Sequence, residues 1–156
     1  MDKHFDLDGA IRKIPNFPKE GILFYDITSI LTNPEAFRYC IDYLVDQYKD
    51  SGIDAIACIE ARGFLFAAPV AEKLGLPIVL VRKKGKLPGK TLEKTFSLEY
   101  GIDTIQVHEE DVKMGTNYLV IDDLIATGGT VRAAVDLITE AGAKVHEIFC
   151  VIGLPF

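Results

Sequence analysis

The residues best suited to chemistry lie at positions 120–130, where an apolar, strand-like run ends in two adjacent acids, Asp122 and Asp123. A short turn follows, and then a helical pattern begins near Gly129. Ligands of parallel sheets bind beyond the carboxyl ends of the strands, and the free N–H groups of the next helix suit a phosphate. The glycines permit close backbone approach, and threonine hydroxyls add donors. The turn predicted to bind phosphate comprises Ala126, Thr127, Gly128, Gly129 and Thr130.

Asp122 and Asp123 need a different role from the phosphate turn, because carboxylates repel phosphate. Adjacent hydroxyls of a ribose, or a Mg²⁺ ion bound with them, would satisfy both acids. The segment is neither a Walker A loop, which ends in Gly-Lys-Ser/Thr, nor a G-x-G-x-x-G dinucleotide turn. Taken alone, it could also be an ordinary helix start with a capped end.

A second candidate is a cluster of basic residues between positions 82 and 94 of an otherwise acidic chain. Such a cluster is either a solvated loop or an anion-binding site. It follows a predicted strand, as the phosphate turn does, so both could face one cleft. The cluster holds six of the 17 basic residues, namely Arg82, Lys83, Lys84, Lys86, Lys90 and Lys94.

The elements that would position these residues alternate along the chain. Helical spacing and capping signals predict helices over about 34–51, which starts at Asn33-Pro34, and over 64–74 and 129–141. Short apolar runs predict strands at 54–59, 76–81, 118–121 and 145–152. Alternation of this kind is typical of α/β proteins with a mainly parallel sheet flanked by helices.

Two segments depart from that alternation. The first residues predict a short helix over 7–14 and then an irregular Pro/Gly-rich stretch to Gly21. Residues 96–108 resemble an antiparallel ribbon that turns near Gly101, and residues 83–95 are predicted to be a mobile polar loop. We expect a single domain, with an N-terminal hood over about 1–32 and a core over 33–156.

The composition excludes several classes of protein. The chain has 156 residues, of which 49% are hydrophobic and 26% charged, and a formal net charge of −6. These values rule out a disordered chain and disfavour binding of nucleic acid by charge alone. The longest apolar run, residues 64–71, is too short to cross a bilayer, and residues 1–10 carry no signal pattern. We expect a soluble cytoplasmic protein.

The cysteines and histidines predict no metal centre of their own. Cys40, Cys58 and Cys150 are far apart and form no C-x-x-C pair, so we interpret them as reduced thiols in the core. The three histidines, at positions 4, 108 and 146, form no cluster.

The segment at 120–130 resembles the phosphoribosyl-pyrophosphate (PRPP) motif of type I phosphoribosyltransferases. Further segments are similar to the adenine phosphoribosyltransferase family, and five ordered motifs together are more specific than any one. The likeness runs from about residue 11 to residue 152. Besides the PRPP motif, it rests on residues 12–28 (RKIPNFPKEGILFYDIT), 59–64 (IEARGF), 81–89 (VRKKGKLPG) and 97–101 (SLEYG).

This resemblance implies the type I phosphoribosyltransferase fold, with a small N-terminal hood and a flexible catalytic loop. It implies a purine salvage enzyme that joins adenine and PRPP, with Mg²⁺, to give AMP and pyrophosphate. Two alternatives remain open: transfer to hypoxanthine, guanine or xanthine, and a non-catalytic regulator that senses PRPP. The family also implies a homodimer in which the neighbouring chain borders the active site.

The resemblance assigns roles to individual residues. Glu99 matches the loop glutamate that lies over the purine, and the Glu60-Ala61 peptide is often cis in this family. Asp122 and Asp123 would bind the ribose hydroxyls and, through them or water, the metal. Pyrophosphate would be bound by Arg62, Lys83 and Lys86 rather than by the solvated Lys90 and Lys94. The base would meet Leu23, Phe24 and Tyr25, of which Leu23 and Phe24 could equally be core residues.

The chain departs from the family pattern in three places. Tyr25 stands where the family often has lysine or arginine, and Gly153 stands where it often has glutamate. The sequence ends at residues 154–156, before a Gly-Arg-Glu-Lys-like stretch that related enzymes usually carry. We expect these differences to affect base binding more than PRPP binding.

Overall fold

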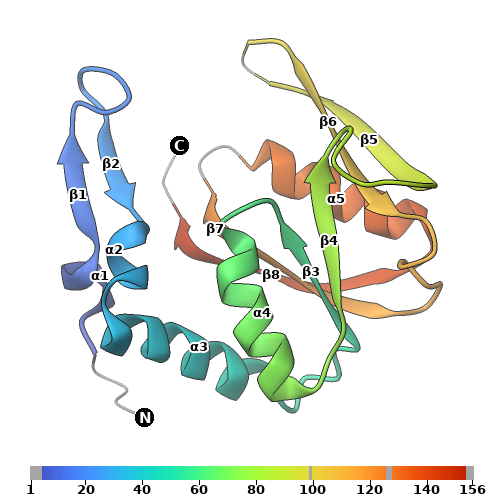
Figure 1. Ribbon diagram of the computed structural model, residues 1–156, viewed down its shortest axis with the longest axis horizontal. Helices are drawn as coiled ribbons and strands as arrows, with labels where there is room; N and C mark the ends of the chain where they lie inside the picture. Colours follow the sequence, from blue (N-terminus) through green and yellow to red (C-terminus); the bar gives the residue numbers. More distant parts are fainter. Residues whose placement is uncertain (1–4, 99, 126–127, 154–156) are drawn as a thin grey trace.

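The structure, a computed structural model, describes residues 5–98, 100–125 and 128–153. Its longer elements alternate between strand and helix in the order that the sequence predicts (Figure 1). The elements are α1 (Leu7–Ala10), β1 (Arg12–Pro15), β2 (Leu23–Asp26), α2 (Thr28–Leu31), α3 (Pro34–Tyr48), β3 (Ala55–Ile59), α4 (Gly63–Leu74), β4 (Ile78–Lys83), β5 (Thr91–Ser97), β6 (Ile102–His108), β7 (Asn117–Ile125), α5 (Gly129–Glu140) and β8 (Lys144–Gly153).

The strands form a six-stranded sheet in the order β5-β6-β4-β3-β7-β8 and a separate two-stranded sheet of β1 and β2. Strands β4, β3, β7 and β8 pair in parallel, whereas β6 is antiparallel to both β4 and β5. This mainly parallel sheet confirms the predicted α/β class. Its parallel strands all end at one edge, where Ile59 pairs with Val81 and Cys58 with Ile121.

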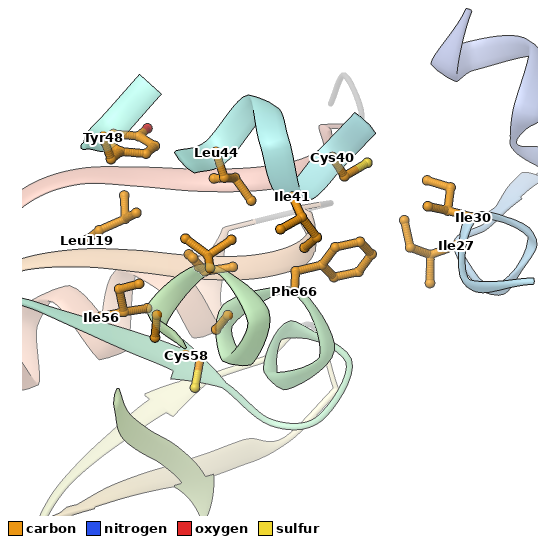
Figure 2. Close-up of a cluster of buried hydrophobic side chains, with 14 of the residues drawn as sticks. Ile27, Ile30, Cys40, Ile41, Leu44, Tyr48, Ile56, Cys58, Phe66 and Leu119 are labelled. Carbon is orange, nitrogen blue, oxygen red and sulfur yellow. The ribbon is translucent and has the colours of Figure 1, made fainter. Parts of the chain in front are cut away.

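The central strands β3 and β7 are buried on both faces, which explains why they are continuous apolar runs. All five residues of β3 are buried, and alternate residues face opposite layers. Ile56 and Cys58 meet Phe66 of α4 in a cluster that also contains Ile41 and Leu44 of α3 (Figure 2). On the other face, alternate strand residues pack against α5 in a cluster formed by Ala55, Ala57, Val79, Val81, Val120, Val131, Ala134, Leu137 and Ile138.

Local signals position the helices that flank the site. Asn33 caps α3, because its side chain accepts a hydrogen bond from the Ala36 N–H, and Pro34 opens the helix as predicted. Helix α4 ends at Gly75, which is left-handed with φ 69°. No helix among the described ranges is long and apolar enough to cross a membrane.

The prediction of a helix over 7–14 was wrong beyond Ala10. Residues Arg12–Pro15 form β1, which pairs antiparallel with β2, so that Ile14 faces Phe24. Pro15 explains the change, because the residue before a proline is driven out of the helical region into an extended conformation.

The prediction of a mobile loop over 83–95 was also wrong for its second half. Strand β5 begins at Thr91, and its seven residues pair with β6, from Thr91 opposite His108 to Ser97 opposite Ile102. Leu92 and Phe96 pack against the α5 layer, and this non-local burial fixes the strand. The loop between β4 and β5 is therefore confined to residues 84–90.

Candidate functional site

The carboxyl end of β7 and the start of α5 form the first part of the site. Asp122 lies near the end of β7 and is only 8% exposed, and the backbone of Asp123 continues the same strand. Gly128 is left-handed, with φ 82°, and its carbonyl accepts a hydrogen bond from the Arg132 N–H at 2.9 Å. The first N–H groups of α5 have no partner within their own helix, so they can donate to an anion. Ala126 and Thr127 lie outside the described residues.

The turn from β3 into α4 forms the second part. The Glu60-Ala61 peptide is cis, as the resemblance implied. Arg62 is the N-cap residue of α4, and Gly63 is its first residue. A Cβ atom on Gly63 would lie 3.0 Å from the carbonyl oxygen of Ile121 and 3.3 Å from the Cα of Asp122. Because Gly63 has no side chain, the start of α4 approaches the end of β7, and Arg62 comes beside Asp122.

The Glu60 carboxylate joins the ends of β3 and β4. Its Oε1 accepts hydrogen bonds from Arg82 Nε at 3.2 Å and from the Lys83 N–H at 3.0 Å. Burial alone would raise the pKa of Glu60, but these hydrogen bonds and the charges of Arg82 and Lys86 outweigh it and lower the pKa. Glu60 therefore stays ionised and neutralises part of the basic cluster.

The structure separates the basic cluster into two groups. Lys83 is exposed, and its Nζ lies 3.7 Å from Asp103 Oδ2, while the charge of Lys86 acts on nearby Glu60. Both lysines are therefore near the end of β4, close to the α4 turn that carries Arg62.

Two of the remaining lysines pair with other acids. Lys84 Nζ lies 3.6 Å from Glu93, and Lys94 Nζ lies 2.6 Å from Glu140 of α5. The hydrogen bond to Glu140 raises the pKa of Lys94. The prediction that Lys94 is simply solvated was wrong, because its side chain crosses from β5 to α5 and is one-third exposed.

The hood carries the residues predicted to meet a base. Leu23, Phe24 and Tyr25 are three of the four residues of β2. Leu23 is 44% exposed, Phe24 meets Phe17 edge-on with ring centroids 5.0 Å apart, and Tyr25 packs against the α3 layer. Leu23 is thus accessible, whereas Phe24 and Tyr25 are half-buried. A plain core role is wrong for Leu23.

A cation, Lys13, lies beside the ring of Tyr25. Lys13, its pairing partner on β1, places Nζ 5.9 Å from the centre of the Tyr25 ring. The same Nζ donates hydrogen bonds to the backbone and side chain of Asp8. A positive charge is therefore present beside the position where the resembling family often has lysine or arginine.

Glu99, the predicted catalytic residue, lies outside the described residues. Its neighbours Leu98 and Tyr100 are described and belong to the turn between β5 and β6. The Leu98 N–H donates to the Gly101 carbonyl at 2.9 Å, and Gly101 has φ 100°. The predicted turn near Gly101 is therefore confirmed.

Two residues of the site were not given these roles from sequence. The sequence marks Gly63 only as part of a motif, and Glu60 only by its peptide bond. A glycine at the first position of a helix, where other residues are preferred, is the signal that could have identified Gly63. Nothing in the local sequence announces that Glu60 binds Arg82 and Lys83.

The described residues were also compared with the requirements of a metal site. Within residues 5–98, 100–125 and 128–153, no three His, Cys, Asp or Glu side chains are grouped to hold a metal. Mg²⁺ is commonly held by one or two carboxylates and by substrate phosphates. Asp122, near the end of β7, fits that mode of binding.

The edge of the sheet thus combines a helix N-terminus, an acidic strand end and several cations. Arg62 follows β3, Lys83 ends β4 and Asp122 lies near the end of β7. The parallel register of these three strands brings their carboxyl ends to the same edge of the sheet. A helix N-terminus and cations suit phosphate groups, and carboxylates suit hydroxyls. The arrangement is suited to a sugar that carries phosphates at two positions.

Comparisons with known proteins agree with this chemistry. Residues 26–154 match the family model described as a phosphoribosyl transferase domain. Over 150 residues the chain is 57% identical to a protein of Treponema denticola named adenine phosphoribosyltransferase, covering 96% of this chain and 79% of the relative.

Two solved structures of adenine phosphoribosyltransferases are similar throughout. The Saccharomyces cerevisiae enzyme, complexed with an imino-altritol bisphosphate and adenine, has a TM-score of 0.88 and 40% identity, covering 95% of this chain and 86% of that one. The Trypanosoma brucei enzyme, complexed with AMP, pyrophosphate and ribose-5-phosphate, has a TM-score of 0.87 and 30% identity, covering 99% of this chain and 70% of that one.

Proposed function

The chain belongs to the adenine phosphoribosyltransferase family of phosphoribosyl transferase domains, and we propose how its residues divide the work of that reaction. It is an enzyme of purine salvage that transfers the 5-phosphoribosyl group from PRPP to adenine, giving AMP and pyrophosphate. The observation that carries this conclusion is the 57% identity over 96% of the chain, together with a site suited to phosphates and hydroxyls.

The β7–α5 turn would bind the ribose 5′-phosphate. The first N–H groups of α5 support this role, since they point beyond the helix, and its dipole favours an anion there. Asp122 and Asp123 would accept hydrogen bonds from the 2′- and 3′-hydroxyls of the ribose. The turn residues in this role are Ala126, Thr127, Gly128, Gly129 and Thr130.

Arg62, Lys83 and Lys86 would bind the pyrophosphate group. Arg62 is supported by its place at the start of α4 beside Asp122, and the lysines by their place at the end of β4. Arginine offers a planar fork for a phosphate, whereas lysine offers a point charge. Glu60 is not expected to repel the anion strongly, because it already bonds Arg82 and the Lys83 N–H.

The hood would recognise the base. Exposed Leu23 supports this role, and backbone groups of Leu23 and Tyr25 would read the adenine edge while Phe24 supplies apolar surface. Glu99 would act at the N7 or exocyclic edge of the purine.

Mg²⁺ would be held by PRPP and, through the ribose hydroxyls or water, by Asp122 and Asp123. When bound, it would supply positive charge that stabilises the departing pyrophosphate. The chain's own residues position the two substrates and exclude water, so that adenine N9 attacks C1 of the ribose from the face opposite pyrophosphate. Closing the site matters because water would otherwise hydrolyse the activated sugar.

We also propose a homodimer whose contact face adjoins the site. Ile78 and Leu80 of β4 and Leu65 of α4 are 36%, 39% and 46% exposed. Ile78 and Leu80 point to the side of the sheet that carries α4, because Val79 and Val81 between and after them pack on the α5 side. Exposed apolar side chains next to Lys83 and Arg62 would place a second copy beside the pyrophosphate site.

The same proposal extends to organisation and location. The two-stranded sheet of β1 and β2 supports a hood over about 1–32 that is distinct from a core over 33–156 within one domain. Cytoplasmic location is supported by the three free thiols, which oxidising compartments would pair or modify.

The role of the acid pair can be tested with Asp123→Asn. We expect AMP formation to fall at least 100-fold, because removing a charge-assisted contact in the transition state costs about 2.7–4 kcal/mol. The stability of the protein without PRPP should not change. Asp50→Asn, an exposed acid after α3, is the control. Full activity of the Asp123 variant would remove its assigned role.

Assays of activity and of PRPP binding, with and without a chelator, distinguish a Mg²⁺-dependent enzyme from a non-catalytic PRPP sensor. Activity should vanish with EDTA and return with Mg²⁺, and calorimetry should show that PRPP binding weakens in parallel. Binding of PRPP without any product, in the presence of Mg²⁺ and adenine, would instead support the sensor.

A further inference from the structure

The hood and the β5–β6 hairpin belong to different sheets, yet one contact joins them. Lys19 Nζ lies 6.0 Å from the centre of the Tyr100 ring, within the range of a cation–π interaction. Lys19 belongs to the loop between β1 and β2, and Tyr100 to the turn between β5 and β6. In Figure 1 that loop and the far end of the hairpin both lie toward the top of the view.

The hood side of this contact has an ordered backbone. Within the loop, the Gly21 N–H donates to Asn16 Oδ1 at 2.9 Å, the Phe17 N–H donates to the Ile22 carbonyl at 3.2 Å, and the Ile22 N–H donates to the Lys19 carbonyl at 3.3 Å. These bonds close the loop on itself. Lys19 therefore extends from a defined position rather than from a flexible tether.

The hairpin side has little else to hold its aromatic ring. Tyr100 is 81% exposed, and its neighbours Leu98 and Ile102 are 44% and 72% exposed. The turn is closed locally by the hydrogen bond from the Leu98 N–H to the Gly101 carbonyl. A large exposed ring on a turn with so little burial would move freely unless a partner such as Lys19 held it.

The contact lies next to segments that carry proposed functional residues. Tyr100 directly follows Glu99, and Lys19 lies four residues before Leu23 of β2. The contact thus connects the turn that carries the proposed catalytic residue with the strand that carries the proposed base-binding residues.

We propose that Lys19 is a positioning residue that holds the Tyr100 turn against the hood, so that the site is closed over adenine during transfer. This inference rests on the proposed function. An exposed cation–π interaction shifts an equilibrium about two- to fivefold, so the closed arrangement would be favoured but would still open for substrates and products.

The kinetic test is a double-mutant cycle of Lys19→Met and Tyr100→Leu, with Lys19→Arg as the conservative variant. Lys49→Met, an exposed lysine at the end of α3, is the matched control. We expect Lys19→Met to lower kcat/KM for adenine about two- to fivefold and to raise hydrolysis of PRPP without adenine. Arginine should restore both values, and the double variant should be no worse than the worse single one.

A second readout does not depend on activity. Chymotrypsin should cut within residues 98–101 about two- to fivefold faster in Lys19→Met than in the wild type or Lys49→Met, because the released turn is open more often. Independent, additive losses in the cycle, or cleavage equal to that of Lys49→Met, would overturn the proposal. A wild type that makes no AMP but shows the cleavage difference would instead contradict the function and leave the contact standing.

Discussion

At the scale of single residues, the site depends on a side chain that is absent. Gly63 lets the start of α4 touch the end of β7, with only 3.0 Å between an added Cβ and the Ile121 carbonyl oxygen. That oxygen belongs to a buried strand and cannot rotate away. Gly63 thereby lets the first residue of α4 lie against Ile121 and Asp122.

The first prediction follows from this close approach. Gly63→Ala should destabilise the fold by about 1–3 kcal/mol, the usual cost of overpacking, and should raise the KM for PRPP by displacing Arg62. Chemical denaturation and steady-state kinetics measure the two effects. Glu72→Ala, an exposed change in the same helix, is the control, and equal behaviour of the two variants would contradict the role of Gly63.

The second prediction concerns pH and Glu60. Because its pKa is lowered in the folded state, ionised Glu60 stabilises the fold above its ordinary pKa of 4.5, and this stabilisation is lost as the pH falls through the folded value. Glu60→Gln should therefore be less stable than the wild type at pH 7, and the difference should shrink below about pH 4.5. Urea unfolding at several pH values measures it, and a difference that grows in acid would refute this account.

Sequence reasoning found the residues of the motifs but not these contacts. Asp122, Arg62 and Lys83 could be predicted because local sequence patterns mark where strands end and helices begin. The partners of Gly63 and Glu60 lie on other elements, at Ile121, Arg82 and Lys83. Only the parallel register of β3, β4 and β7 brings them together, so no local pattern could reveal them.

At the scale of elements, the helices with strong capping signals formed where the sequence predicted them. Helix α3 starts after Asn33, whose Oδ1 accepts from the Ala36 N–H at 3.2 Å. Strand β5 could not be predicted because Lys94 interrupts the apolar positions: Leu92 and Phe96 face the α5 layer, and Lys94 on the same side reaches Glu140. The stem of a lysine can cover apolar surface, so a polar residue there does not mark a loop.

The third prediction tests the local signal for α3. Asn33→Ala should lower the free energy of unfolding by about 1 kcal/mol, because a helix N–H loses its side-chain acceptor. Asn33→Asp should restore most of it. Activity of the folded enzyme should not change, since α3 packs behind the sheet, and a loss of turnover without a loss of stability would contradict this assignment.

At the scale of the whole molecule, two apolar layers enclose the sheet while a third apolar surface stays open. Helices α3 and α4 cover one face and α5 the other (Figure 1). The hood forms its own small sheet and joins the α3 and α4 layer through Ile11, Ile27 and Ile30. The open surface includes Leu65, Ile78 and Leu80, beside the proposed pyrophosphate site.

The fourth prediction concerns assembly. If this surface binds a second copy, Leu80→Lys should shift the protein from dimer to monomer in light scattering, because a charge cannot be buried there without a partner. Met114→Lys, an exposed apolar residue after β6, is the control and should stay dimeric. A wild-type monomer, or a dimer unaffected by Leu80→Lys, would show that this surface is not the interface.

The central claim is the transfer of a phosphoribosyl group to adenine, and a product assay tests it most directly. The purified chain is incubated with PRPP, Mg²⁺ and each of adenine, hypoxanthine, guanine and xanthine, and nucleotide and pyrophosphate are measured together. We predict equal amounts of AMP and pyrophosphate from adenine, and little nucleotide from the other bases. A preference for another base, or no nucleotide from adenine, would contradict the account.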